Sequence, residues 1–279
     1  MCLYKNMRKK RILVTGCAGS IGSEIVRQLS KNNDIFGIDT NESGLFSIQN
    51  ECGMYGRVGD IRNKETVHDI FSDFKPQMVF HAAAYKHVPL MEKYPEEAIQ
   101  TNIIGTSNIV SESKKWECLE KFVYISTDKV VNAHCIMGIS KKFGEVLTVN
   151  QGKGFVAVRF GNVMGSRGSL LPIWEEQINK GRPITITDDR MERYFMTIEE
   201  AVSLVIKAAD DGIGGEVYIL DMGKPIRIID LAKKIVSHLG RDVPIENIGI
   251  REGETLGERL MTEEEEKRAI KKGQFYIIK

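Results

Sequence analysis

Short apolar runs alternate with amphipathic stretches along the first half of the chain. The runs predict strands at residues 12–14, 35–38, 54–58, 78–80, 122–125 and 155–158. The amphipathic stretches predict helices after the first strand, over residues 65–74, after Pro95, and over residues 136–150. Strands that alternate with helices at this spacing indicate an α/β fold, with a parallel sheet covered on both faces.

The pattern changes from about Gly161, where Gly, Ser, Arg and Pro interrupt the apolar runs. We therefore expect a larger α/β domain at residues 1–165 and mainly a smaller, interleaved lobe at 166–279. Residues 195–221 are expected to return to the first domain, because residues 216–220 again form an apolar run. Thr197 and Glu200 have capping-box spacing, and residues 228–239 predict an amphipathic helix. The acidic run at residues 263–266 predicts a solvated helix face.

Composition narrows the class of protein. The chain has 279 residues, 42% hydrophobic and 28% charged, which is enough for a sizeable core. Its formal net charge of +1 gives no reason to expect a nucleic-acid partner. The basic start lacks the apolar run of a signal peptide, and no stretch is long enough to span a membrane, so we expect a cytoplasmic protein. The 5 cysteines have no metal-ligand spacing, so no metal site is expected and each is interpreted as a small apolar filler.

The first predicted strand is followed at once by a glycine-rich turn. Gly16, Gly19 and Gly22 form the pattern G-x-x-G-x-x-G ahead of a helix. Glycines in this position permit a tight turn, and the helix amino terminus attracts an anion such as a pyrophosphate. The strand before and the helix after are the context that dinucleotide binding requires. The fold class is therefore predicted to be a Rossmann-type doubly wound sheet with a smaller carboxyl-terminal substrate lobe.

Two aspartates follow the next strands. Asp39 ends the second strand, where a carboxylate can accept both ribose hydroxyls and repel a 2′-phosphate, so NAD is expected and NADP is less favoured. Asp60, beside Ile61 after the third strand, is a candidate for the adenine amino group. A turn or helix-cap role remains the alternative for each aspartate.

Several blocks resemble the extended short-chain dehydrogenase/reductase superfamily. Within it, the sequence is similar to the polysaccharide-biosynthesis UDP-N-acetylglucosamine 4,6-dehydratases from Arg11 to about Glu258. The blocks are Gly16 to Glu24, His81 to Pro89, Thr101 to Thr106, Ser126 to Lys129, Met137 to Lys141, Arg159 to Val163, Ser166 to Ser169 and Ile184 to Asp188. The resemblance implies cofactor contacts from Ser20, Ile21, Ala82, Ala83, Asn102 and Lys141, and substrate contacts from Lys86, Asn162 and Arg193.

The superfamily carries Tyr-x-x-x-Lys on a helix, whereas this chain has Met137 and Lys141. One helical turn places both residues on the same face. A thioether cannot relay the substrate proton, while the lysine can bind the nicotinamide ribose. The resemblance implies a branch of the family with this methionine; a buried core residue in a non-catalytic homologue is the alternative.

Thr127, Asp128 and Lys129 follow the fifth strand, at the sheet edge where ligands bind. The resemblance implies three steps: hydride leaves C4 of the sugar, water is lost across C5 and C6, and hydride returns to C6. Lys129, with a pKa lowered by burial and by the charge of Lys141, would remove the C5 proton. A protonated Asp128 would donate to the C6 hydroxyl, and Thr127 would bond the C4 hydroxyl. Lys129, or Asp128 acting through Thr127 or water, are candidates for the base that replaces tyrosine.

Two departures and two alternatives stay open. The family usually has Pro and Asn where this chain has Ala133 and Cys135, and the block at residues 251–254 matches only in part. A nucleotide-sugar 4-epimerase shares the expected fold, cofactor and C4 oxidation, but has no need for the Asp128–Lys129 pair. A non-catalytic NAD-binding module is the second alternative. A UDP-sugar is the expected small-molecule partner, and the resemblance implies a homo-oligomer.

Overall fold

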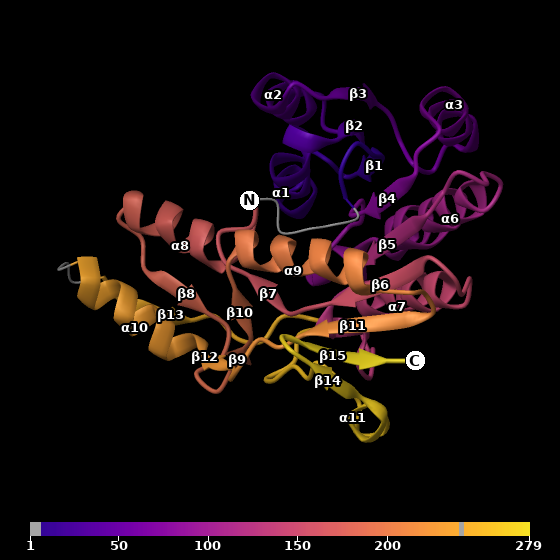
Figure 1. Cartoon of the computed structure of the whole chain (residues 1–279). Coiled ribbons are helices and arrows are strands. Elements are labelled where there is room, and N and C mark those ends of the chain that lie inside the picture. The colour runs from indigo at the N-terminus through magenta and orange to yellow at the C-terminus, as the bar shows by residue number, and fades with distance from the viewer. Residues whose placement is uncertain (1–6, 240–242) are drawn as a thin grey trace.

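The computed structural model describes residues 7–239 and 243–279 of the chain (Figure 1). Residues 1–6, which include Cys2 and part of the basic amino-terminal start, lie outside these ranges. The expectations that concern them stay predictions. Across the described ranges, no helix combines the length and apolarity that crossing a bilayer requires.

A nine-stranded sheet runs through the described part of the chain (Figure 1). In spatial order its strands are β14 (Ile270–Lys272), β15 (Phe275–Ile278), β11 (Glu216–Leu220), β6 (Phe155–Arg159), β5 (Lys121–Ile125), β4 (Met78–His81), β1 (Arg11–Thr15), β2 (Asp34–Asp39) and β3 (Tyr55–Val58). The strands from β3 to β11 are parallel, while β15 and β14 add antiparallel pairs at one edge. All six strands expected from the apolar runs are present, which confirms the Rossmann-type fold.

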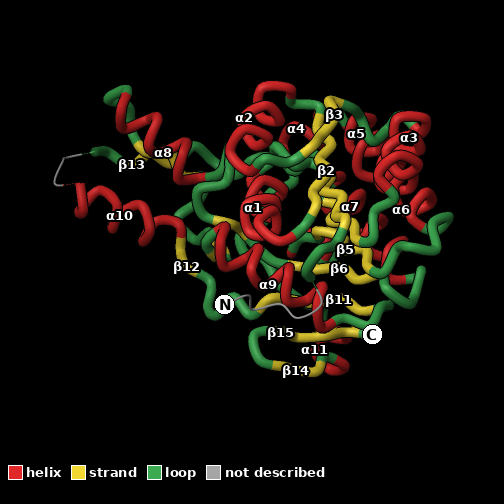
Figure 2. Tube along the Cα trace, turned by 45° about the horizontal axis from the view of Figure 1, so that its top comes forward, coloured by secondary structure: helices red, strands yellow, loops and turns green. Residues whose placement is uncertain are grey.

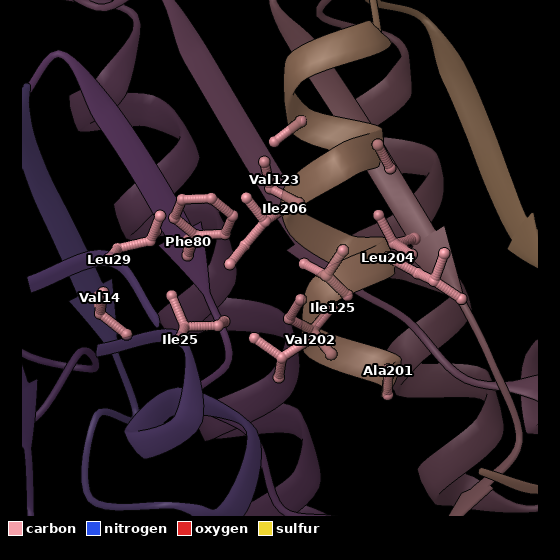
Figure 3. Close-up of a cluster of buried hydrophobic side chains, with 14 of the residues drawn as sticks. Val14, Ile25, Leu29, Phe80, Val123, Ile125, Ala201, Val202, Leu204 and Ile206 are labelled. Carbon is pink, nitrogen blue, oxygen red and sulfur yellow. The ribbon is translucent and has the colours of Figure 1, made fainter. Parts of the chain in front are cut away.

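Helices cover both faces of the sheet (Figure 2). One face carries α1 (Ser20–Leu29), α2 (Glu42–Cys52) and α9 (Ile198–Asp211), and the other carries α3 (Lys64–Phe74), α6 (Thr106–Ser113) and α7 (Ile136–Val149). Figure 3 shows the first core, where Ile25 and Leu29 of α1 and Val202 and Ile206 of α9 point toward Phe80 of β4. The predicted capping box at the start of α9 is present. Burial of these apolar faces stabilises the fold by about 25 cal/mol for each Å² removed from water.

The helical run expected after Pro95 is divided. After α4 (Val88–Lys93) come α5 (Pro95–Ala98), a π-helical turn (Ile99–Gly105) and then α6. A Cβ at Gly105 would lie 2.6 Å from the Ile61 side chain, so a glycine permits the close approach of this turn to the loop after β3. Such π turns are rare and often accompany functional sites.

A smaller lobe extends from the carboxyl edge of the sheet (Figure 2). It contains α8 (Leu170–Asn179), β8 (Ile184–Ile186), β9 (Glu192–Arg193), β12 (Ile226–Arg227), α10 (Ile228–Leu239) and β13 (Ile245–Asn247). Its own core gathers around the fully buried Trp174. A short pair, β7 (Asn162–Val163) and β10 (Phe195–Met196), joins the lobe to the sheet.

The carboxyl-terminal segment differs from the expectation in two ways. Residues 270–278 form β14 and β15 and extend the large sheet, instead of belonging to the smaller lobe. The acidic helix α11 (Glu263–Arg268) is not fully solvated, because Glu265 turns inward and pairs with Arg159 of β6. The first feature depends on the open edge of the sheet at β11, and the second depends on the buried cation Arg159. Both partners are distant in sequence from residues 263–278, so the local sequence pattern could not reveal these contacts.

Candidate active site

The glycine-rich turn between β1 and α1 has a shape that only small residues allow. Gly16 has a φ of +68°, and a Cβ there would lie 2.7 Å from the backbone nitrogen of Ala83. A Cβ at Gly22 would collide with the carbonyl of Gly16. Gly19 is the N-cap of α1 without any side-chain cap, so the first N–H groups of that helix point toward the hollow beside the turn. This geometry is a cradle for an anionic group.

Two adjoining hollows follow the carboxyl ends of the strands, of about 210 Å³ and 570 Å³. Gly16 and Gly19 line both of them, so the glycine-rich turn separates one from the other. The smaller hollow is lined by the predicted residues Asp39, Asp60, Ile61, Ala82 and Ala83. The larger hollow is lined by the predicted residues Ser20, Ile21, Gly22, Lys86, Thr127, Lys129, Met137, Lys141, Asn162 and Arg193.

Asp39 is fixed at the end of β2. Its Oδ2 accepts a hydrogen bond from the backbone nitrogen of Ala18 at 2.9 Å, and its Oδ1 accepts from that of Asn41 at 2.8 Å. Each carboxylate oxygen keeps acceptor capacity toward the smaller hollow. A diol could therefore bind here.

Asp60 is held by its neighbour Arg62, whose Nε donates to Oδ2 at 2.7 Å. Burial raises the pKa of Asp60, but the hydrogen bonds and charge of Arg62 outweigh it and leave that pKa below its ordinary value. Asp60 is thus an ionised acceptor at the rim of the smaller hollow.

Asn102 corrects one expectation. Its side chain is fully buried and lines neither hollow. Its Oδ1 accepts from the backbone nitrogen of Tyr85, and its Nδ2 donates to the Tyr85 carbonyl and to Ser140 Oγ. This amide therefore positions the segment after β4 and joins it to α7, because its hydrogen bonds are already used inside the protein.

Asp128, Lys129 and Glu258 form a buried charged cluster at the carboxyl end of β5. Lys129 Nζ lies 3.0 Å from Asp128 Oδ1 and 2.9 Å from Glu258 Oε1. Thr127 Oγ1 donates to Asp128 Oδ1 at 2.9 Å, and Arg193 Nε lies 3.3 Å from Glu258 Oε1. Lys129 lines the larger hollow, while Asp128 lies beneath it with its side chain fully buried.

The electrostatics of this cluster bear on the expected protonation of Asp128 and Lys129. Burial raises the pKa of Asp128 to about 7, with a further contribution from Glu258 and an opposing one from Lys129. Burial also favours neutral Lys129, but the charges of Asp128 and Glu258 outweigh it, so the pKa of Lys129 is raised. The expected lowered pKa of Lys129 is therefore wrong, because two carboxylates face it. Burial opposes ionisation of Glu258 too, yet Lys129 and its other partners lower that pKa to about 2.

Met137 and Lys141 share one face of α7, as their spacing predicted. Met137 packs with Val88, Met91 and Cys135 and also lines the larger hollow. Lys141 Nζ donates to the carbonyl of Ile125 at 2.5 Å. Burial lowers the pKa of Lys141 to about 7, against the opposing charge of Glu145. Lys141 is thus an amine poised near neutrality.

The predicted substrate residues have unequal roles. Asn162 Nδ2 is buried with no hydrogen-bond partner among the described residues, so it is available to a ligand. Lys86, Arg167 and Lys129 all line the larger hollow, which makes this wall cationic. Partial desolvation and the charges of Arg167 and Lys129 lower the pKa of Lys86. Arg193, in contrast, is already engaged with Glu258 and with the carbonyls of Thr255 and Leu256. It holds the carboxyl-terminal segment over the site.

Sequence reasoning missed two residues of the site. Glu258 marked only the carboxyl-terminal limit of the region that resembles the family, and no sequence spacing links it to residues 127–129. Arg167 lies within a block that carries the resemblance but was given no role; it lines both hollows, and its guanidinium donates to the carbonyl of Ala18. Among residues 7–239 and 243–279, no group of His, Cys, Asp and Glu side chains is arranged to hold a metal.

Comparison with known proteins agrees with this fold. A family model described as "Polysaccharide biosynthesis protein" matches residues 12–279. The capsular polysaccharide biosynthesis protein CapD of Staphylococcus aureus is 46% identical over 281 residues, which cover 94% of this chain and 47% of that protein. The chain thus spans about half the length of this relative. The UDP-glucose 4-epimerase of Rickettsia typhi is 34% identical, with 96% of this chain and 82% of that protein covered.

Solved structures give the same result. The X-ray structure of Pen from Bacillus thuringiensis superposes with a TM-score of 0.92 at 33% identity, covering 98% of this chain and 90% of that one. The UDP-glucose 4-epimerase of Thermus thermophilus in complex with NAD has a TM-score of 0.78 at 24% identity, over 88% of this chain and 89% of that one, a likeness of fold. The chain therefore belongs to the polysaccharide biosynthesis protein family of extended short-chain dehydrogenases/reductases.

Proposed function

We propose that this chain is an NAD-dependent nucleotide-sugar 4,6-dehydratase that converts UDP-N-acetylglucosamine to a 4-keto-6-deoxy sugar. The observation that carries the proposal is the Asp128–Lys129 pair at the hollow that Lys141 also lines. Oxidation at C4 needs only a cofactor and one base, whereas elimination of water needs a second base and an acid. The product would serve the synthesis of a surface polysaccharide or glycan.

The residues present fit NAD. The glycine-rich turn, the uncapped start of α1 and Asp39 would hold its diphosphate and adenosine ribose. Asp60 and Ile61 would border the adenine, and Lys141 the nicotinamide ribose. When bound, NAD supplies reversible hydride transfer, first from C4 of the sugar and then to C6. The carboxylate of Asp39 would disfavour a 2′-phosphate and hence NADP.

The cationic wall of the larger hollow suits the substrate diphosphate. Lys86 and Arg167 lie there, and the free amide of Asn162 adds a neutral donor. Charge-assisted hydrogen bonds from such groups to phosphate oxygens are about twice as strong as neutral ones. Arg193 would contribute indirectly, by holding Glu258.

Each proton transfer has a candidate group. Lys141, with a pKa of about 7, is the amine best prepared to take the proton of the C4 hydroxyl in place of the missing tyrosine. Thr127 would bond that hydroxyl. Asp128, about half protonated at neutrality with a pKa of about 7, lies beneath the hollow. It would pass its proton through water or through Thr127, which lines the hollow and hydrogen-bonds to it, to the departing C6 oxygen, which leaves as water.

Lys129 would remove the C5 proton, but only as the free amine. Its ammonium already hydrogen-bonds two carboxylates at 2.9–3.0 Å, so its proton can pass along an existing hydrogen bond to one of them. The C5 proton then restores the ammonium, whose hydrogens exchange with water, and the ammonium returns a hydrogen to C5 when hydride reaches C6. The C4 hydroxyl proton taken by Lys141 replaces, through exchange with water, the proton that Asp128 gave up. The net change is then loss of one water from the sugar, with the cofactor unchanged.

Two other functions remain to be separated by experiment. A 4-epimerase is favoured by the 34% identity to the Rickettsia typhi enzyme. A non-catalytic NAD-binding module is favoured by Met137, which cannot transfer a proton. The retained cluster of Asp128, Lys129 and Lys141 supports an enzyme.

Incubation with UDP-N-acetylglucosamine and NAD in heavy water tests the proposal. Because C5 is deprotonated and reprotonated, NMR should find deuterium at C5, a ketone at C4 and a methyl group at C6 that carries the original C4 hydrogen. An inverted C4 alcohol without deuterium at C5 would establish the epimerase. An unchanged sugar with NAD bound would favour the binding module.

We also propose that the chain forms a homo-oligomer. Ile139, Phe143 and Val146 are spaced at three and four residues along α7 and are between 43% and 49% exposed. A second copy of the chain would cover this apolar stripe. Light scattering should report a dimer or larger, and a monomer at micromolar concentration would contradict the proposal.

A further inference from the structure

Two carboxyl oxygens at the candidate active site are buried without a donor. Asp128 Oδ2 and Glu258 Oε2 have no hydrogen-bond partner among the described residues. Their sister oxygens are both occupied, because Lys129 Nζ contacts Asp128 Oδ1 and Glu258 Oε1. A buried acceptor without a donor costs about 1–3 kcal/mol. Two such acceptors in one cluster need a further proton.

The two carboxyl groups are close enough to supply it to each other. Each contacts the same Lys129 Nζ, at 3.0 Å and 2.9 Å, so their carboxyl groups lie side by side, and a protonated oxygen of one can donate to the free oxygen of the other. Asp128 Oδ2 is also tightly enclosed, since a Cβ on Gly161 would lie 2.9 Å from it. One proton between these groups satisfies both oxygens.

Glu258 reaches this position through the tertiary fold. Arg193 of β9 holds its Oε1 and the preceding carbonyls of Thr255 and Leu256. On the other side, Arg159 of β6 donates to the carbonyl of Leu260. The segment is therefore anchored before and after Glu258, and these anchors fix the Glu258 side chain beside Asp128 and Lys129.

We propose that Glu258 is a positioning residue for the Asp128–Lys129 pair: it shares a single proton with Asp128, and its own negative charge holds Lys129 as an ammonium. Its effect on turnover rests on the proposed dehydratase function, whereas the shared proton does not. Glu258 lines neither hollow, so it acts through Asp128 and Lys129 and not on the sugar itself.

The charges that face the cluster come from four segments. Lys129 neighbours Asp128 on the same loop, Glu258 comes from the carboxyl-terminal segment, and Arg193 comes from β9. Lys86, after β4, lies close enough for the charge of Lys129 to lower its pKa. Lys129, Arg193 and Lys86 favour ionised carboxyls, so the protonated state of Asp128 depends on its burial and on the negative charge of Glu258.

Glu258→Gln tests the proposal, because glutamine keeps the shape and removes the charge. The loss of that charge lowers the pKa of Asp128, so the proton needed at C6 is lost at a lower pH. The alkaline limb of the kcat profile should therefore move to lower pH, with KM little changed. At a pH above the wild-type pKa, the protonated fraction of Asp128 falls about tenfold for every pH unit by which its pKa has dropped. Glu258→Asp should restore part of the wild-type profile.

Glu263→Gln is the matched control, since Glu263 is exposed in the same segment and pairs only with Arg259 among the described residues. Its profile should equal that of the wild type. An equal loss of kcat at every pH in Glu258→Gln would indicate a merely structural role and would overturn the proposal.

A direct titration keeps the inference independent of activity. In protein labelled with ¹³C at aspartate carboxyls, the signal that Asp128→Asn removes identifies Asp128. It should titrate near pH 7 in the wild type and at lower pH in Glu258→Gln. Titration in the ordinary aspartate range in the wild type would refute the shared proton, even if Glu258→Gln did not fold. If Asp128 titrates as proposed but the protein is inert toward nucleotide sugars, the shared proton stands and only the proposed function is refuted.

Discussion

Replacing Arg159 with methionine should destabilise the protein strongly. The Arg159 side chain is fully buried and pairs with Glu145 at 2.7 Å and with Glu265 at 2.8 Å. Methionine fills much of the same volume but leaves two carboxylates without their main cation. Glu145 keeps Lys142 at 2.8 Å and a hydrogen bond from Ser126, so part of its charge stays compensated.

The expected magnitude follows from burial. Removing one partner of a buried pair costs about 3–5 kcal/mol. A domain of this kind has a free energy of unfolding of about 5–15 kcal/mol, so the loss is a large fraction of the total. At about 2–4 °C for each kcal/mol, Tm should fall by about 6–20 °C.

Urea unfolding followed by circular dichroism measures the loss. Arg259→Gln is the control, because Arg259 is exposed and pairs at 3.4 Å with the exposed Glu263 of the same segment. Exposed pairs are worth about 0–1 kcal/mol, so this variant should be near wild type. If Arg159→Met lowers the free energy of unfolding by less than about 1 kcal/mol, then Glu145 and Glu265 do not depend on Arg159 for compensation of their charge.

The same ion pairs predict a dependence on pH. Burial alone would raise the pKa of Glu265, but hydrogen bonds and charge from Arg159 lower it to about 2. A carboxyl with a depressed pKa in the folded state stabilises the protein above its ordinary pKa, and this stabilisation is lost as pH falls toward about 2. Glu265→Gln should therefore be less stable near neutrality and should lose less stability than the wild type in acid. Parallel curves for the two proteins would contradict this.

Three further predictions concern the candidate site. NAD should bind more tightly than NADP, and Asp39→Ala should reduce the difference; equal binding of both cofactors to the wild type, measured by calorimetry, would remove Asp39 from its proposed role. Asp128→Asn and Lys129→Met should each lower turnover by about 10²–10⁴-fold while NAD binding is kept; near-normal rates would contradict the proposed acid–base roles. Met137→Tyr should not be needed for activity, so an inert wild type together with an active tyrosine variant would favour the non-catalytic alternative for this chain.

The sequence alone determined the architecture and the shape of the glycine-rich turn. The predicted strands and most of the helices are present because their signals are local: apolar runs of strand length, amphipathic faces, and the capping box at Thr197 and Glu200. The glycine-rich turn was predictable for the same reason, since its shape depends on neighbouring residues. The carboxyl-terminal strands were not predicted, because nothing nearby in sequence reveals that β11 leaves a sheet edge open.

Only the tertiary structure decided the electrostatics of the site. Residues 127–129 could be placed at a strand end, but the rise in the pKa of Lys129 depends on Glu258, which reaches the site from the far end of the chain. Asn102 was expected at the cofactor and instead joins two protein segments, because its partners come from residues 85 and 140. Charge–charge energies depend on distance and burial, and neither quantity exists until segments remote in sequence are packed together.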